Sequence, residues 1–301
     1  MEFPITKCAM EGFQVIKRAP GAVVVWILVY LAFIALMFGG LFAIMGQAGV
    51  FNAMGGGLAN TNTTDPTAAF KAIGSMMGVI ALMLPLSIVL SMVMLCAIMR
   101  AVLRPEDKSF FYLRLGGDEL RIFVVALFYY LLAILVFGAL VGGTAWGCIA
   151  EWKVNRGLSV LIGFAGGLVA LAVALVFWNR ACLSFPATFA TRSIRLFDGW
   201  RLSRGRFWPL VGMNLLAMLV AIAIGIGFSM VAQIFQFSAM GSAMGRGGVG
   251  SASELAAPMM TGLAVSFGIQ MVGAVVQMVL EYAPAAAAYR EIVRPNQAAE
   301  F

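Results

Sequence analysis

The chain has 301 residues, of which 62% are hydrophobic and only 11% are charged, and its mean hydropathy is +0.97. Soluble domains carry about 25% charged residues, so the composition excludes a soluble globular protein and indicates a polytopic helical membrane protein. The net charge of +7 does not indicate nucleic-acid binding, because the basic residues flank apolar runs and form no separate basic domain.

Six apolar stretches are each long enough to cross about 30 Å of hydrocarbon as a helix. We predict an all-α protein with membrane spans at residues 20–46, 72–103, 120–147, 158–180, 208–233 and 257–290. The first stretch is too long for a signal-peptide core, so we expect it to remain as a membrane helix. Pro85 and Pro284 are candidate kinks in the two longest spans.

The connections between the spans alternate in charge. Residues 47–70 contain no Lys or Arg and residues 234–256 contain one, whereas residues 104–119 and 180–207 are strongly basic. Of the 20 basic residues, 16 fall on the side of the two termini and 4 on the other side. Because Lys and Arg concentrate in cytoplasmic loops, we expect both termini to lie in the cytoplasm.

The most basic connection is residues 179–209. At about 100° per residue, Phe189, Leu196, Trp200 and Phe207 fall on one side of a helix, and most of the arginines lie off that side. The pattern is typical of a basic amphipathic helix at a membrane surface, where guanidinium groups bind phospholipid phosphates. The other interpretation is that these arginines only fix the topology and snorkel to the interface.

Arginines also mark the ends of the even-numbered spans. Together with the basic connection they form our predicted site for lipid headgroups or a protein partner: Arg100, Arg104, Arg180, Arg192, Arg195, Arg201, Arg204, Arg206, Arg290 and Arg294.

The spans also resemble one another at their ends, which predicts an internal repeat. The second span ends Arg100-Ala-Val-Leu-Arg104-Pro105, the sixth ends Arg290-Glu-Ile-Val-Arg294-Pro295, and the fourth ends in a looser copy, Arg180-Ala-Cys-Leu-Ser-Phe-Pro186. Phe13, Phe111 and Trp200 open similar segments before the odd-numbered spans. Within a single transmembrane domain we therefore predict repeats at about 1–104, 105–186 and 187–295, followed by a polar tail at 296–301. Each repeat would hold a surface helix, an outward span, an outer loop and an inward span. The other interpretation is that helix-end chemistry alone produces the likeness.

A polar stripe in the sixth span offers an alternative function. Gln270, Gln277 and Glu281 are spaced by seven and four residues and so share one helix face. Polar groups inside hydrocarbon often mark an ion or substrate path, so the stripe favours a small transporter or channel. Alternatively, Glu281 lies near the cytoplasmic interface and pairs with an arginine there.

Two segments resemble a known bacterial family. They are Asp198-Gly-Trp-Arg-Leu-Ser-Arg-Gly-Arg-Phe-Trp208 and Ala288-Tyr-Arg-Glu-Ile-Val-Arg-Pro295. The chain resembles the membrane domain of membrane-bound glycerophosphoryl diester phosphodiesterases and related inner-membrane proteins, which implies the bacterial inner membrane. Those phosphodiesterases add a soluble barrel with catalytic histidines. This sequence has no histidine, and its six spans leave no room for a barrel of about 250 residues.

Catalysis and metal binding have little support in the sequence. Histidine, the commonest general base, is absent, and the four cysteines form no CxxC pair. The adjacent acids Asp118 and Glu119 precede the third span and suit a helix N-terminus. We therefore expect no enzyme, metal or cofactor. Our main hypothesis is a non-enzymatic inner-membrane protein that binds phospholipids or a membrane or cytoplasmic partner, in envelope or lipid homeostasis.

Overall fold

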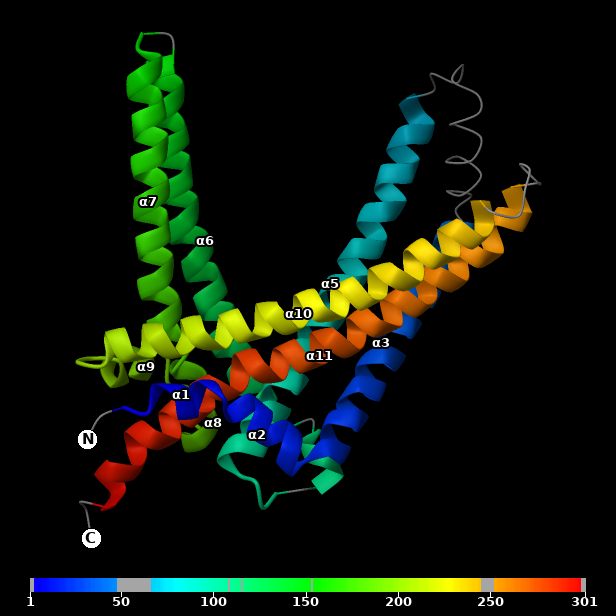
Figure 1. Cartoon of the computed structure of the whole chain (residues 1–301). Coiled ribbons are helices and arrows are strands. Elements are labelled where there is room, and N and C mark those ends of the chain that lie inside the picture. The colour runs from blue at the N-terminus through cyan, green and yellow to red at the C-terminus, as the bar shows by residue number, and fades with distance from the viewer. Residues whose placement is uncertain are drawn as a thin grey trace. The chain divides into compact units, whose positions relative to one another are not determined.

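The computed structural model describes residues 3–47, 66–107, 109–114, 116–152, 154–244 and 252–298. Regular structure within these residues is helical, and six of the helices are long and apolar enough to cross a membrane (Figure 1). The protein is therefore an all-α, multi-pass membrane protein, as the composition indicates.

The six long helices confirm the six predicted spans. They are α3 (Pro20–Gln47), α5 (Pro66–Leu103), α6 (Gly117–Trp152), α7 (Arg156–Ala181), α10 (Phe207–Met244) and α11 (Ala252–Ala298). α5 runs through Pro85 and α11 through Pro284 without a break in the helix assignment. Residues 48–65, which are most of the first predicted neutral connection, and residues 245–251, a smaller part of the second, lie outside the described residues.

Two short helices precede the first span. α1 (Ile5–Ala9) and α2 (Glu11–Arg18) are separated by a turn at Met10. α2 is amphipathic, because Val15 is buried while Lys17 and Arg18 are exposed. A helix therefore lies where the first predicted repeat is expected to begin with one.

The basic connection is not one amphipathic helix, so that prediction is wrong. It holds α8 (Ser184–Thr191) and the single turn α9 (Asp198–Leu202), with Arg192 between them at a left-handed φ of 51°. The hydroxyl oxygens of Thr188 and Ser184 accept hydrogen bonds from the backbone N–H groups of Arg195 and Gly199. These hydroxyls replace the carbonyl acceptors that a continuous helix would supply, and the chain turns.

The segment before α6 is a turn and not the expected surface helix. Phe110, Phe111 and Tyr112 have φ values of 48°, 57° and 67°. This conformation costs roughly 1–2 kcal/mol per residue for side chains with a Cβ. Two hydrogen bonds hold the turn: the Tyr112 hydroxyl donates to Pro105 O at 3.1 Å, and Leu113 N donates to Phe110 O at 3.1 Å. The rings of Phe110 and Phe111 are exposed.

The chain divides into two compact units. One, the junction unit, contains the described residues of 1–20, 95–224 and 277–301; the other contains those of 21–94 and 225–276. These units do not coincide with the predicted repeats. In the second unit α10 and α11 approach closely, because Gly273 packs against Phe228 and Gly262 against Ala239.

Within the junction unit, α6 and α7 form an antiparallel hairpin (Figure 1). Gly166 of α7 packs against Thr144 of α6, and the Ser159 hydroxyl donates to Cys148 O at 2.9 Å. Many large apolar side chains of this hairpin are exposed, including Leu135, Ile149 and Val160. That pattern suits helices that face lipid.

Candidate functional site

The candidate site is built where the helices α5, α7 and α11 end in the junction unit. Each of these ends carries an arginine, and each arginine contacts the segment that precedes an odd-numbered span. We call the three contact regions the α5, α7 and α11 junctions.

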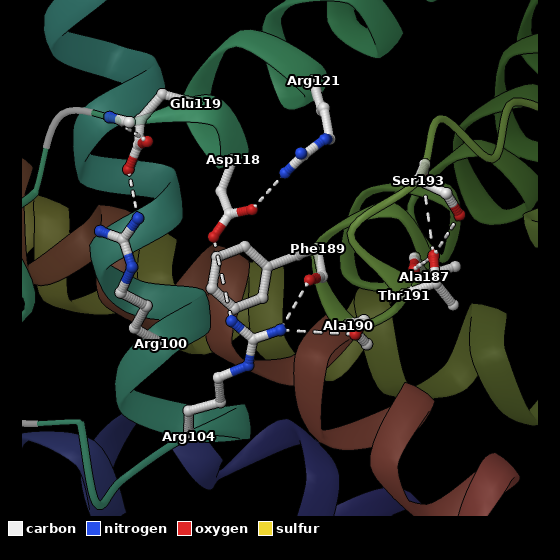
Figure 2. A network of polar contacts seen from close by, with 11 residues as sticks. Arg100, Arg104, Asp118, Glu119, Arg121, Ala187, Phe189, Ala190, Thr191 and Ser193 are labelled. Carbon is white, nitrogen blue, oxygen red and sulfur yellow. Dashed lines mark hydrogen bonds and ion pairs between the residues drawn. The ribbon is translucent and has the colours of Figure 1, made fainter.

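At the α5 junction Arg100 is buried in an ion pair. Its Nη2 donates to the Glu119 carboxylate (Figure 2). Its Nη1 donates to Tyr112 O at 3.0 Å. Only 4% of Arg100 and 7% of Glu119 is exposed. Glu119 also accepts from the backbone N–H of Gly116 at 2.8 Å. The left-handed turn is thus fixed to the end of α5, and Arg100 has no surface left for a lipid headgroup.

One helical turn later, Arg104 joins α5 to α8. Its Nη1 lies 3.8 Å from Asp118, and its guanidinium lies 4.9 Å from the centre of the Phe189 ring (Figure 2). Its Nη2 donates to the carbonyls of Phe189 and Ala190 at 3.2 and 3.4 Å. Asp118 is shared with Arg121, 2.7 Å away. Most of the bonding capacity of Arg104 is therefore used inside the protein.

The α11 junction repeats this chemistry with residues from the two ends of the chain. Arg290 donates to Glu11 of α2 at 3.1 Å, and Glu11, which is only 1% exposed, also pairs with Arg18 at 3.5 Å. Lys7 and Glu291 form a further pair at 3.0 Å. Arg290 also donates to Val102 O at 3.2 Å, so α11 and α5 are joined directly.

Burial at this junction also changes the chemistry of Cys8. Removal from solvent is the largest cause, and the carboxylates of Glu291 and Glu11 add to it; together they raise the pKa of the Cys8 thiol to about 11. Cys8 is therefore a buried, protonated thiol at neutral pH, which is unreactive.

The α7 junction has the same layout, but no carboxylate of the described residues pairs with its arginine. The guanidinium of Arg180 lies 5.0 Å from the centre of the Trp200 ring of α9. Gly199 beside it presses on the end of α7, where a Cβ would overlap Arg180 O and the Ser184 hydroxyl. Gly12 of α2 makes the matching approach to α11, where a Cβ would lie 2.9 Å from the Cα of Leu280. Both surface segments depend on a glycine for close packing.

Hydroxyl groups complete the α7 junction. Ser184 Oγ lies 2.8 Å from the Tyr129 hydroxyl and donates to Leu196 O at 3.0 Å. Nearby, Asn214 of α10 donates to the buried Asn179 of α7 at 2.8 Å. Asn179 and Asn214 therefore serve as a helix–helix hydrogen bond.

Beyond the junctions, the connection between α7 and α10 forms a surface that is both basic and apolar. We call it the basic surface, and it comprises Arg192, Ile194, Phe197, Arg204, Arg206 and Trp208, all exposed. In the part of the chain that the structure describes, no carboxylate pairs with its three arginines. Arg195 and Arg201 lie beside it and pair with Asp198 at 3.6 and 3.7 Å. The side chain of Arg294, also predicted for this site, lies outside the description.

The predicted polar stripe of α11 consists of residues with different surroundings. Gln277 is half-buried and donates to Ala221 O of α10 at 3.1 Å. Gln270 and Glu281 are exposed. Glu281 has no ion pair with any residue that the structure describes, and in particular none with Arg290.

Two residues of the candidate site, Glu11 and Glu119, are not among those that the sequence predicts. Both are buried partners of the junction arginines, and Glu119 is predicted only to suit a helix N-terminus. Their signal is a carboxylate close before an odd-numbered span. Among the described residues, no three Cys, Asp or Glu side chains gather as metal ligands do.

Comparison of the chain with protein-family models, with curated proteins and with solved structures gives no match.

Proposed function

We propose that this protein is a non-enzymatic membrane protein whose basic surface binds the headgroups of anionic phospholipids. The observation that carries the proposal is the composition of that surface: Arg192, Arg204 and Arg206, which pair with no carboxylate of the described residues, share one connection with exposed Ile194, Phe197 and Trp208. Apolar side chains that enter the acyl boundary, beside cations at the level of the phosphates, are typical of interfacial segments. The turn before α6 adds the exposed rings of Phe110 and Phe111.

The internal pairing of the other arginines supports this assignment. Arg100, Arg104 and Arg290 form ion pairs and hydrogen bonds with acids and carbonyls of the chain, so they stabilise the contacts between helix ends. We therefore restrict the headgroup-binding set to the basic surface and Arg180, with Arg195 and Arg201 at its edge. Near an anionic leaflet each unpaired cation contributes about 1 kcal/mol.

The orientation belongs to the same proposal. With both termini in the cytoplasm, the basic surface faces the inner leaflet of a bacterial inner membrane, in agreement with the distribution of Lys and Arg. In a cysteine-free variant, Val154→Cys between α6 and α7 should react with an impermeant maleimide from outside intact cells. Ser193→Cys should react only after lysis. The opposite pattern would overturn the orientation.

The threefold repeat is also part of the proposal, and the junctions support it. In a cycle, α2 contacts α11, the turn before α6 contacts α5, and α9 contacts α7. Each surface segment thus meets the inward helix of the preceding repeat, and the first repeat meets the last. Three unrelated packings of the paired spans in residues 1–104, 105–186 and 187–295 would contradict the repeat.

The headgroup test uses quenching of tryptophan fluorescence by brominated lipids. A variant that keeps Trp208 and replaces the other five tryptophans with Phe is reconstituted in vesicles with brominated phosphatidylglycerol or brominated phosphatidylcholine. We expect Trp208 to be quenched preferentially by the anionic lipid.

Removing three charges, with Arg192→Asn, Arg204→Gln and Arg206→Gln, should reduce that preference about tenfold or more. Asn is chosen at position 192 because it tolerates the left-handed backbone. The matched control removes three charges from the proposed outer side: Lys71→Gln, Lys153→Gln and Arg156→Gln. Equal quenching by the two lipids in the parent variant would reject headgroup binding.

A further inference from the structure

The α7 junction differs from the other two in its charge balance. Arg100 is matched by Glu119 and Arg290 by Glu11, each within a buried ion pair. Arg180 holds the corresponding place at the end of α7, but it contacts no carboxylate in the described parts of the chain.

The acid that corresponds to Glu11 is engaged elsewhere. Glu11 stands two residues before Phe13, and Asp198 stands two residues before Trp200. Asp198 bonds to Arg195 at 3.6 Å and to Arg201 at 3.7 Å, both on its own segment. Within the described residues, the positive charge of Arg180 is therefore left without a counterion.

The surroundings of Arg180 orient its guanidinium group and leave part of it available to an anion. Its guanidinium is stacked on Trp200, which holds the planar group in one orientation. Its Nε is buried and has no hydrogen-bond acceptor, whereas the residue as a whole is only half-buried, so the other guanidinium nitrogens remain reachable. A half-buried cation without a counterion is unfavourable, and an anion that contacts the reachable nitrogens would compensate its charge.

We propose that Arg180, held against Trp200, binds the phosphate group of an anionic phospholipid, and that this phosphate takes the place of the missing carboxylate. A guanidinium offers two parallel N–H donors that match two phosphate oxygens. The inference rests on the proposed headgroup binding and identifies one specific site for it. A lipid phosphate and free inorganic phosphate share this chemistry, so the experiment separates them.

Native mass spectrometry of the detergent-purified chain measures binding of dioctanoyl phosphatidylglycerol and, separately, of inorganic phosphate. We expect the lipid to bind and Arg180→Gln to weaken its binding at least tenfold. Arg180→Lys, which keeps the charge but loses the paired donors, should lie between the two. The matched control is Arg121→Gln, which removes one cation that is already paired with Asp118, and it should bind like the parent.

The outcomes distinguish this inference from the proposed function. Equal lipid binding by the parent and Arg180→Gln overturns the Arg180 site; if the triple variant of the basic surface then loses binding, the proposed function stands. Lipid binding by none of the proteins overturns both. Inorganic phosphate bound at Arg180 as tightly as the lipid assigns the site to a free anion and overturns the lipid source.

The thermal unfolding midpoint of Arg180→Gln shows whether the variant loses lipid binding only because its fold is destabilised. Without lipid, Arg180→Gln should unfold at or above the parent midpoint, because it removes an uncompensated cation. A lower midpoint together with lost lipid binding would show that Arg180 acts by holding α9 in place, which also overturns the site.

Discussion

The Arg100–Glu119 pair makes the sharpest prediction about stability. Glu119→Gln keeps the size of the side chain and removes its charge, so the guanidinium of Arg100 stays buried without a counterion. Their side chains are only 5% and 8% exposed, so solvent offers little compensation. Removing one partner of such a pair costs about 3–5 kcal/mol.

The structure indicates that the loss of unfolding free energy in Glu119→Gln lies at the lower end of that range. Arg100 keeps two carbonyl acceptors, Tyr112 O at 3.0 Å and Arg114 O at 3.4 Å. Glu119 accepts from Arg100 with one oxygen and from Gly116 N with the other. A glutamine has a single carbonyl oxygen, so it cannot make both hydrogen bonds with good geometry. We therefore expect a loss of about 3 kcal/mol, which corresponds to a fall in the unfolding midpoint of about 6–12 °C.

A thiol-reactive fluorescent dye can follow this unfolding in detergent. Cys96 is fully buried one helical turn before Arg100, so a variant that keeps only Cys96 reports opening of this junction. Glu119→Asp, which keeps the charge on a shorter side chain, should lie between the parent and Glu119→Gln. Arg121→Gln breaks a partly exposed pair within one turn of α6, and Asp118 keeps Arg104 as a partner, so the change should cost below about 0.5 kcal/mol. A Glu119→Gln midpoint within 2 °C of the parent, or equal to that of Glu119→Asp, would refute the argument about the uncompensated charge.

Three further predictions concern packing and reactivity. Gly12→Ala should lower stability by about 1–3 kcal/mol in the same dye assay, because its Cβ would lie 2.9 Å from the backbone of Leu280; Gly227→Ala, whose Cβ would meet nothing within 4 Å, should not. Asn214→Leu removes the donor to Asn179 and should cost about 0.6–1.7 kcal/mol, and a loss above that range would show a larger role for the pair. Cys8, with its pKa raised to about 11, should be alkylated by iodoacetamide slowly at pH 8 and faster as the pH rises toward 11. Because the folded thiol has the higher pKa, its contribution to stability is present below the ordinary thiol pKa and is lost as the pH rises through the folded value; rapid alkylation of the folded protein at pH 8 would contradict the burial of Cys8.

The sequence predicted the six long helices well because their signals are local. Length and hydropathy decide whether a stretch crosses hydrocarbon, and the predicted limits of the first and fourth spans lie within two residues of α3 and α7. The prediction of one helix for the basic connection was wrong, for a reason that the spacing of apolar residues does not show. Hydroxyls at Thr188 and Ser184 take over backbone donors and turn the chain, although the apolar spacing suits a helix.

The candidate site was predictable only in part. Arginines at helix ends are visible in the sequence, but their partners are not, because Glu11 lies 279 residues from Arg290. The left-handed backbone at Phe110 to Tyr112 was also hidden, since aromatic residues rarely adopt it and no glycine signals it. Contacts distant in the sequence, and not local preference, determine which arginines remain free.

The contact between Glu11 and Arg290 has a consequence for biosynthesis. A ribosome releases α2 long before it makes the end of α11. Until α11 is complete, the carboxylate of Glu11 is therefore solvated or paired with Arg18 alone. Docking of α2 on α11 is therefore a late event that requires the nearly complete polypeptide. Ribosome stalling or truncation shortly before Arg290 would leave the amino-terminal segment undocked, a state that quality-control proteases in the membrane could recognise.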